Sequence, residues 1–357
     1  MAAQIEKFGR GNIHPLISII VLNCNGSNWL PKCFESIMTQ TIIDQIETIM
    51  VDNNSSDDST QVAREWFVKF PMASLVCNAD NLGFCEGNNS GAREASGRWL
   101  LFLNNDTWLE PDCMEKLVTA TEQMDAAAST PLVLNYPDSS FQDFGFYGFD
   151  LLGLPSGSKT ATNSREIFIA GGCSFFIRTD VFNQIGMFDA EYFIYSDDSD
   201  LSWRVWIAGH KVAGIFEARL HHRGAAGVNP SGGVMTVEFR TTDNKRFLTN
   251  RNSLLTLLKN GQHILLLPIG PLVAWLFVES LAGAVLLRRA SFIKSTFWNV
   301  LADCWRLRHH VLQERKRVSA FRKRSDFWML RFFRLRPNRW FEVKRALQLG
   351  LPRVDAK

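Results

Sequence analysis

The sequence predicts an α/β fold in which helices cover both faces of a mostly parallel sheet, followed by a helical extension. From residue 16 onward, short apolar segments alternate with segments of helical periodicity, the order expected when crossover helices join parallel strands. Three of the apolar segments end in Asn or Asp. Ligands of such sheets bind at the carboxyl ends of the strands, so the same pattern predicts where a site lies.

Composition narrows the class of protein. The chain of 357 residues exceeds one typical domain, and its 46% hydrophobic and 21% charged residues are typical of a packed globular protein. Seven Cys without CxxC spacing favour a reducing compartment over a disulfide framework or a zinc cluster. Residues 1–15 are expected to form an N-terminal tail, because they lack the apolar core of a signal peptide.

Charge is divided unevenly along the chain. Residues 1–287 hold 20 Lys and Arg against 31 Asp and Glu, whereas residues 288–345 hold 17 against 4. The basic segment predicts a polyanion or an anionic membrane surface as partner.

The elements follow from local patterns. Apolar runs predict strands, and apolar residues near helical spacing predict the helices between them. Ser56 is the expected N-cap of the second helix. Strands are expected at 16–23, 46–53, 74–78 and 98–106, and helices at 28–40, 56–70 and 87–96.

Polar residues follow three of these strands, at Asn23, at 52–54 and at 104–106. Asn and Asp favour turns, which would explain one such end. Three successive ends favour a site at the strand edge. The stretch "LFLNNDTW" raises a further question, because its single carboxylate, Asp106, is less than a divalent metal usually requires.

The middle of the chain has weaker patterns. Residues 130–165 are rich in Gly, Pro, Ser and Phe, which predicts a long loop or irregular strands that shape an acceptor pocket. A strand, a Gly171-Gly172 interruption and a second strand are expected over 166–178. The paired glycines either let backbone approach a ligand closely or form a β-bulge.

Acidic residues gather before the next helical pattern. Asp197, Asp198 and Asp200 lie within four positions, directly after the aromatic-rich segment 192–195. A helix N-terminus favours acids through its dipole, but the aromatic neighbours indicate raised carboxyl pKa values and general-base chemistry. We expect at least one of the three to be catalytic.

The adjacent His221 and His222 follow a predicted strand at 211–218. Neighbouring side chains on a strand point to opposite faces, so at most one of the two enters a given site.

The segment 264–287 is an apolar stretch of 24 residues with one charged side chain, Glu279. This length can span a bilayer. Because basic, aromatic-bearing sequence follows, we favour a helical segment lying in the membrane interface. A single span and a buried helical hairpin of a soluble domain are the alternatives.

Four motifs now carry a family resemblance: "ISIIVLNCNG", "VDNNSSDDST", "NLGFCEGNNSGAREASGRWLLFLNNDT" and "GMFDAEYFIYSDDSDLSWRVWIAG". In this order they resemble the family 2 glycosyltransferases, and most closely the rhamnosyltransferase-like branch that builds bacterial surface polysaccharides. The resemblance covers residues 16–260, and "RNSLLTLLKNG" and the later tail also resemble that branch.

The resemblance implies a GT-A domain over 16–260, a membrane-association region over 261–357, and inverting transfer from a nucleotide sugar. It assigns Asn23 and Asp52 to the nucleoside pocket. It assigns donor binding also to Asn89, Asn104 and Asn105.

The same resemblance assigns Asp106 to the last carboxylate of the metal motif and Asp198 to the base. His221 resembles a histidine that completes the metal shell, although His222 competes for that role. Asp197 replaces the family's usual Glu. Three further residues are candidates for a supporting role in the site, namely Asp197, Asp200 and Gly172.

The implied cofactor is Mg²⁺ or Mn²⁺. Such an ion borrows diphosphate oxygens as ligands, so one carboxylate and one His suffice from the protein. The sequence contains neither a GxxxxGK[ST] loop nor an evident Ser-His-Asp arrangement, so kinase and hydrolase functions lack support.

These observations predict a glycosyltransferase that moves rhamnose or another hexose from a dTDP- or UDP-sugar to a lipid-linked saccharide. It would work at the cytoplasmic face of the plasma membrane, on an anionic surface. The alternative is a catalytically degenerate GT-A domain that acts as a scaffold, with Asn104 in place of an acid. A nucleic-acid partner is not expected, since the apolar segment 264–287 would serve no purpose there.

Overall fold

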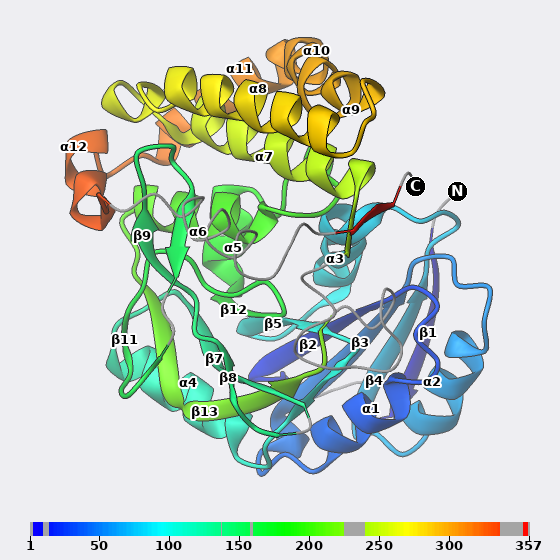
Figure 1. The fold of residues 1–357 in the computed structure, drawn as a ribbon. Coiled ribbons are helices and arrows are strands. Elements are labelled where there is room, and N and C mark those ends of the chain that lie inside the picture. The colour runs from blue at the N-terminus through cyan, green and yellow to red at the C-terminus, as the bar shows by residue number, and fades with distance from the viewer. Residues whose placement is uncertain are drawn as a thin grey trace.

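The computed structural model describes residues 3–9, 14–136, 138–157, 160–224, 240–335 and 353–355. A large twisted sheet carries helices on both faces, and a layer of C-terminal helices covers one of those helical faces (Figure 1). The expected α/β class with a helical extension is confirmed.

The sheet has mixed strand directions. The four strands expected from the N-terminal half are parallel neighbours in the order β4-β3-β2-β5. Beyond β5, strand β12 runs antiparallel to its neighbours, whereas β7 and β13 pair in parallel. The strands of the main path are β1 (Gln4–Gly9), β4 (Met72–Cys77), β3 (Ile46–Asp52), β2 (Ile17–Asn23), β5 (Trp99–Asn104), β12 (Ser174–Arg178), β7 (Ala128–Asn135), β13 (Val212–His222) and β11 (Arg165–Glu166).

Two expectations need correction at the edges of this sheet. Residues 4–9, expected in a tail, form β1 and pair antiparallel with β4. Gly171 and Gly172 form a turn before β12 rather than a bulge inside it. The region 130–165 contains short strands, as one alternative foresaw, because β7 is followed by β8 (Phe141–Asp143), β9 (Phe146–Phe149) and β10 (Pro155–Gly157).

Alternate residues of the central strands enter two separate cores. On β2, Ile19 and Val21 pack with α1 (Leu30–Met38), α2 (Ser59–Phe67) and α4 (Cys113–Gln123). Ile20 faces the opposite core, which α3 (Gly83–Glu94), α5 (Thr179–Ile185) and α6 (Asp197–Ile207) cover. Burial on both faces explains why these strands are continuous apolar runs. Helix α2 begins at Ser59, after Asp58, so Ser56 is not its N-cap.

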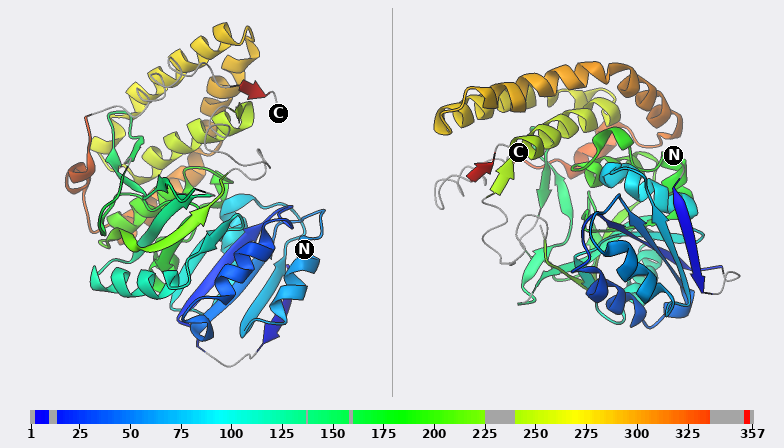
Figure 2. Two further views of the ribbon diagram at one scale, coloured as in Figure 1. Left: turned by 60° about the horizontal axis from the view of Figure 1, so that its bottom comes forward. Right: turned by 90° about the vertical axis from the view of Figure 1, so that its right-hand side faces the viewer.

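The C-terminal helices share the second core (Figure 2). Leu272, Phe297 and Val311 belong to the same buried cluster as Trp203 of α6. The boundary at residue 260 therefore does not separate two hydrophobic cores. The helices of this layer are α7 (Asp243–Asn260), α8 (Ile269–Leu286), α9 (Ser291–Ile293), α10 (Asn299–Arg306), α11 (Arg308–Phe321) and α12 (Asp326–Met329), with a π-helical turn over Lys294–Trp298.

Part of the basic segment serves the fold itself. Arg315 donates to the carbonyl of Gly261, and Arg322 donates to that of Asn260. Arg324 donates to the carbonyls of residues 209 and 210. These cations satisfy backbone acceptors at the ends of helices and the following turns, so they are not free to meet a partner surface.

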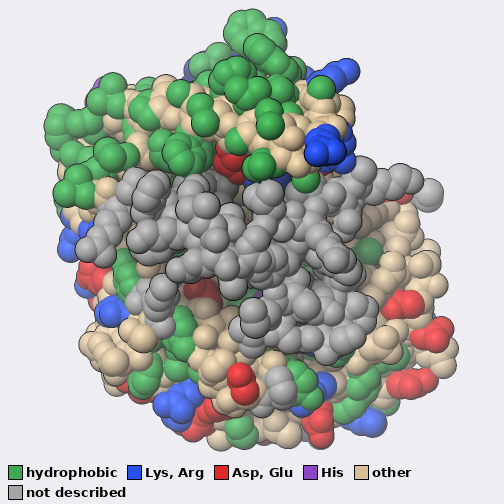
Figure 3. All heavy atoms as spheres, in the orientation of Figure 1, with side chains coloured by type: hydrophobic (Ala, Val, Ile, Leu, Met, Phe, Trp, Pro, Cys, Tyr) green, Lys and Arg blue, Asp and Glu red, His purple; other side chains and the backbone are tan. Residues whose placement is uncertain are grey.

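Helix α8 buries one side and exposes the other. Leu272, Leu276, Ser280 and Ala284 recur every four residues and are buried, which places them on one face. The opposite side exposes apolar residues, among them Val285 at 69%. Figure 3 shows hydrophobic side chains gathered over this part of the molecule. Within the described residues, Ile264–Leu286 is the one helical stretch long and apolar enough to cross a membrane.

We predict that Asp326 is a main stabiliser of the C-terminal layer. Its buried Oδ2 accepts backbone N–H bonds from Gln262, His263 and Leu265 at 2.8, 2.6 and 3.1 Å. Asp326→Ala leaves buried donors unpaired and should cost roughly 3–5 kcal/mol of unfolding free energy, measured by urea denaturation. The exposed Asp44→Ala is the control and should cost less than about 0.5 kcal/mol. Equal effects of the two substitutions would contradict this role.

Candidate active site

The carboxyl ends of β2, β3 and β5 bring three polar side chains together, as the strand-end pattern predicts. Asn23 Nδ2 lies 3.3 Å from Asp52 Oδ1, and Asn105 Nδ2 donates to Asn23 Oδ1 at 2.7 Å. Asp52 Oδ2 also accepts from the backbone of Ser55 at 2.9 Å. Asn23 and Asp52 are buried. This chain of hydrogen bonds forms one wall of a site at the strand edge.

The loop after β2 crosses directly over this wall. A Cβ on Gly26 would lie 2.1 Å from Asn105 Nδ2 and 2.3 Å from Asn23 Oδ1. Only glycine therefore fits between these two amides. Gly26 is not among the predicted site residues, although "NCNG" after a strand is a turn signal that points to it.

Asn89 is satisfied by the backbone of the protein. Its Nδ2 donates to the carbonyl of Phe188, and its Oδ1 accepts from the N–H of the same residue, at 2.9 and 3.0 Å. Both halves of the buried amide are thus engaged. In this structure Asn89 joins α3 to the segment ahead of α6, and its expected role in donor binding stays a prediction. Asn104 donates its backbone N–H to Cys173, and its side chain is half-buried.

The histidine beside Asp106 is His222, not His221. Strand β13 continues to His222, and its Nε2 lies 3.3 Å from Asp106 Oδ1. His221 points to the other face, where it stacks on Trp108 with ring centroids 5.4 Å apart and approaches Glu110. As predicted, the two side chains point to opposite faces, and His222 rather than the expected His221 lies beside Asp106.

Gln142 fixes the orientation of the His222 ring. Gln142 Oε1 lies 3.0 Å from His222 Nδ1, and its Nε2 donates to the His222 carbonyl. The amide oxygen accepts from Nδ1–H, which leaves Nε2 as the ring nitrogen that faces the Asp106 carboxylate. Burial lowers the pKa of His222, but Cys173 and Asp106 reverse this effect and hold the pKa well above its ordinary value.

Asp106 and His222 suit a divalent cation as a two-ligand set. One carboxylate and one imidazole with a fixed tautomer can ligate Mg²⁺ or Mn²⁺. Among the described residues no group of three or more His, Cys, Asp or Glu could hold a metal. The remaining ligands would therefore have to come from the diphosphate and water.

Asp197 and Asp198 open helix α6 as a coupled acidic pair. Burial raises the pKa of Asp198 to about 6, and the nearby charge of Asp143 adds to this rise. Burial and the charge of Asp198 raise the pKa of Asp197 to about 8. The two carboxyls titrate as a coupled pair, and burial is the leading cause of both raised pKa values. The expected rise thus holds for Asp197 and Asp198, whereas the pKa of Asp200 is lowered.

A short turn joins the acidic pair to the His222 region. A Cβ on Gly172 would lie 3.3 Å from Asp198 Oδ2, and a Cβ on Gly171 would lie 2.5 Å from Asp143 Oδ2. Cys173, next in the chain, contacts His222. Gly172 thus lies beside Asp198, as its supporting role predicts. Asp143 and Cys173 were not selected, because only strand pairing brings 141–143 and 171–173 to this position.

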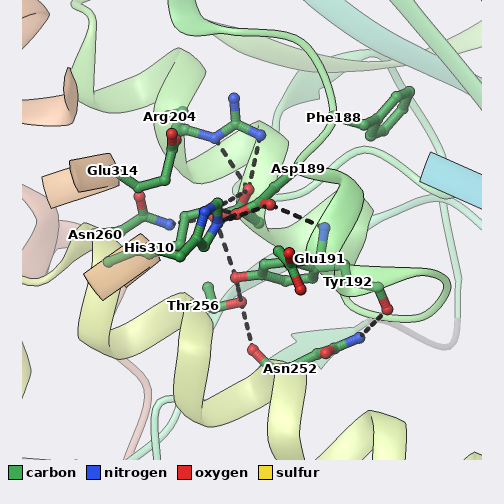
Figure 4. Close-up of polar contacts among 12 residues, drawn as sticks. Phe188, Asp189, Glu191, Tyr192, Arg204, Asn252, Thr256, Asn260, His310 and Glu314 are labelled. Carbon is green, nitrogen blue, oxygen red and sulfur yellow. Dashed lines mark hydrogen bonds and ion pairs between the residues drawn. The ribbon is translucent and has the colours of Figure 1, made fainter. Parts of the chain in front are cut away.

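Asp200 belongs to a separate buried ion cluster, of which Figure 4 shows Asp189, Arg204 and His310. Its Oδ2 pairs with Arg204 Nη2 at 2.7 Å and with Lys259 Nζ at 3.1 Å. Lys259 also pairs with Asp189 at 2.5 Å, and His310 of α11 lies 3.0 Å from the same carboxylate. Burial alone would raise the pKa of Asp200, but Arg204 and Lys259 lower it. Asp200 therefore supports the site by anchoring α6.

Part of the chain is similar to a known family. Residues 18–186 match the model of "Glycosyl transferase family 2". A putative glycosyltransferase EpsH of Bacillus subtilis is 33% identical over 37% of this chain and 36% of that protein. The O-antigen biosynthesis protein RfbC of Myxococcus xanthus is 27% identical over 59% of this chain and 18% of that protein. The chain thus matches well under two thirds of the length of either relative.

Comparison with solved structures supports the fold. A mannosyltransferase of Pyrobaculum calidifontis, determined with GDP-Man and Mn²⁺, superposes with a TM-score of 0.52. The superposition covers 87% of this chain and 85% of that one at 14% identity. The sheet and its helices thus have a GT-A-like fold, and within it residues 18–186 are similar to the glycosyl transferase family 2 domain.

Proposed function

We propose that the chain is an inverting, metal-dependent glycosyltransferase of surface-polysaccharide synthesis. The donor would be a nucleotide sugar, such as a dTDP- or UDP-linked rhamnose or hexose, and the acceptor a lipid-linked saccharide. One observation carries the proposal: Asp198, with a pKa raised to about 6, lies against Gly172. A carboxylate of this pKa is ionised at neutral pH and still basic enough to take a proton.

Inverting transfer needs a single base. Asp198 would accept the proton of the acceptor hydroxyl while that oxygen forms its bond to the anomeric carbon. The bond from this carbon to the diphosphate breaks at the same time, and the diphosphate leaves with the electron pair. Protonated Asp197 would add no second negative charge beside the base, so the hydroxyl proton has one acceptor.

The leaving group would lie on the other side of the turn 171–173. Asp106 and His222 would hold the divalent cation, and Gln142 would keep the His222 ring in the ligating tautomer. A bound Mg²⁺ or Mn²⁺ neutralises the charge that develops on a leaving diphosphate. The Asn23–Asp52 pair would bind the nucleoside from the β2–β3 edge.

The exposed face of α8 would lie on an anionic membrane at the cytoplasmic side. Val278 and Val285 expose apolar surface there, and Trp298 and Trp305 expose aromatic rings nearby in the chain. Exposed cations follow at Arg288, Lys294 and Arg308. Apolar residues, Trp and cations on one helical layer are typical of interfacial binding.

We predict that Asp198→Asn lowers catalysis about 10²–10⁴-fold, because an amide cannot take the proton. The assay measures nucleoside diphosphate release from a panel of UDP-, dTDP- and GDP-sugars, with and without Mn²⁺. Binding of UDP with Mn²⁺, measured by calorimetry, should stay unchanged. If the unmodified chain neither releases nucleoside diphosphate nor binds UDP, with or without Mn²⁺, the scaffold alternative is favoured instead.

The pH dependence follows from the same residue. Because ionised Asp198 is the active form, the rate should fall as the pH drops through about 6 and then decline roughly tenfold per pH unit. A rate that stays constant down to pH 5 would exclude Asp198 as the base.

The two histidines provide a matched pair of substitutions. His222→Ala removes an imidazole beside Asp106 and should weaken Mn²⁺-dependent binding of UDP by at least about tenfold. His221→Ala removes a ring stacked on Trp108 and should leave this binding within about twofold. Calorimetric titration of UDP with Mn²⁺ compares them, and the reverse order of effects would restore His221 as the ligand.

Membrane association is tested on α8. Val285→Asp places a charge on the exposed face and should reduce flotation with vesicles of phosphatidylglycerol and phosphatidylcholine about tenfold, the equivalent of one lost buried Val. Val68→Asp is the control, because Val68 is 71% exposed at the end of α2 and far along the chain from α8. Equal flotation of both variants would contradict a membrane-facing α8.

A further inference from the structure

The segment before the acidic pair has an unusual backbone. Met187, Phe193, Tyr195 and Ser196 all have positive φ angles, of 62°, 60°, 74° and 58°. None is glycine, and each such conformation costs on the order of 1–3 kcal/mol. The last of them directly precedes Asp197. Neighbouring elements must therefore hold this segment in place, and its conformation decides where Asp197 and Asp198 lie.

Two adjacent side chains of helix α7 donate hydrogen bonds to the backbone carbonyls of this segment, residues 191–195. Asn252 Nδ2 lies 3.0, 2.9 and 2.7 Å from the carbonyl oxygens of Tyr192, Ile194 and Tyr195. Arg251 Nη2 lies 2.6 and 3.1 Å from the carbonyl oxygens of Glu191 and Tyr192. Figure 4 shows Asn252 pointing toward Tyr192 from α7. Asn252 is fully buried.

The orientation of the Asn252 amide is determined by its partners. Its Oδ1 accepts from Arg251 Nε at 2.9 Å, so Nδ2 faces the three carbonyl oxygens. Carbonyl oxygens need a donor, and only the NH₂ group supplies one. Arg251 is in turn held by Asp303 of α10 at 2.9 Å.

Helix α3 holds the remaining carbonyl of this segment from the other side. The N–H groups of Phe84 and Cys85 donate to the carbonyl of Phe193 at 2.6 and 3.1 Å. Every backbone carbonyl from 191 to 195 thus bonds to α3 or α7. Two helices thus hold the carbonyls of this segment, and Asn252 is the side chain that contacts most of them.

We infer that Asn252 is a positioning residue for the acidic pair of α6. By holding the carbonyls of 192, 194 and 195, it sets the strained turn that presents Asp198 to Gly172. The inference rests on the proposed function, in which Asp198 is the base. Asn252 acts through the backbone of the turn and has no bond of its own to Asp197 or Asp198 among those recorded for it.

The test substitutes Asn252 and compares it with Asn250. Asn250 is also a buried Asn of α7, and its Nδ2 donates at 3.1 Å to the carbonyl of Thr296, away from the acidic pair. Asn252→Ala and Asn250→Ala remove the same atoms from the same helix. Asn252→Ser, which keeps one hydroxyl donor, provides a milder variant should Asn252→Ala fail to fold.

We expect Asn252→Ala to lower kcat for nucleoside diphosphate release roughly 10²-fold, the effect of a base displaced by about 1 Å. The kcat of Asn252→Ser should lie between that of Asn252→Ala and that of the unmodified chain. KM for the donor, and the Kd of UDP with Mn²⁺, should stay within about threefold, because the donor site is not touched. Asn250→Ala should keep kcat within about threefold at a comparable loss in unfolding midpoint.

The pH profile separates positioning from general stability. Asp198 is faced by Asp197 on its own helix, by Asp143 and by the Gly172 turn. Loosening the turn lets water reach these carboxyls, so the acid limb of kcat should shift about one pH unit lower in Asn252→Ser. An unshifted limb, or a loss of kcat equal to that of Asn250→Ala, would overturn the inference. A fully active Asp198→Asn would instead overturn the proposed base.

Discussion

The buried charge of Lys259 is the constraint on which the arrangement of this protein depends. A fully buried ammonium costs several kcal/mol unless carboxylates surround it, and Asp189 and Asp200 do so at 2.5 and 3.1 Å. These three residues come from α7, from the turn before α6, and from α6 itself. Their pairing therefore fixes α7, the first C-terminal helix, on α6, the helix that begins with the acidic pair. His310 extends the same cluster to α11, so the region beyond residue 260 is built into the domain.

Close backbone approach is the second organising feature of the site. Gly26 allows two amides to meet across the strand ends, and Gly171 and Gly172 allow two carboxylates to lie against one turn. At Gly26 and Gly171 a methyl group would occupy space that a polar side chain fills, and at Gly172 it would lie in tight contact with Asp198. These glycines therefore let the polar groups of the site approach one another closely. Functional residues alone, without these glycines, would not form this arrangement.

The sequence predicted those parts of the fold that depend on local pattern. The strands at 16–23, 46–53, 74–78 and 98–106 were found at nearly their expected bounds, because buried parallel strands are continuous apolar runs. The meeting of Asn23, Asp52 and Asn105 followed from parallel order. Asp143 could not be predicted, since the antiparallel pairing of β8 with β7 brings it to the site. Likewise, period-2 alternation separates His221 from His222 but does not say which face holds Asp106.

Helix α7 relates the acidic pair to the exposed apolar surface. Its residues 251 and 252 hold the turn before α6, and Lys259 and Asn260 bond to Asp200 within α6. Its other side packs against α8, through contacts that include Arg246 with Glu279 at 2.6 Å. One helix therefore contacts both the helix with the exposed apolar face and the turn that precedes Asp197 and Asp198. Because α7 bonds to both, the position of the acidic pair relative to the exposed face of α8 is set by this helix.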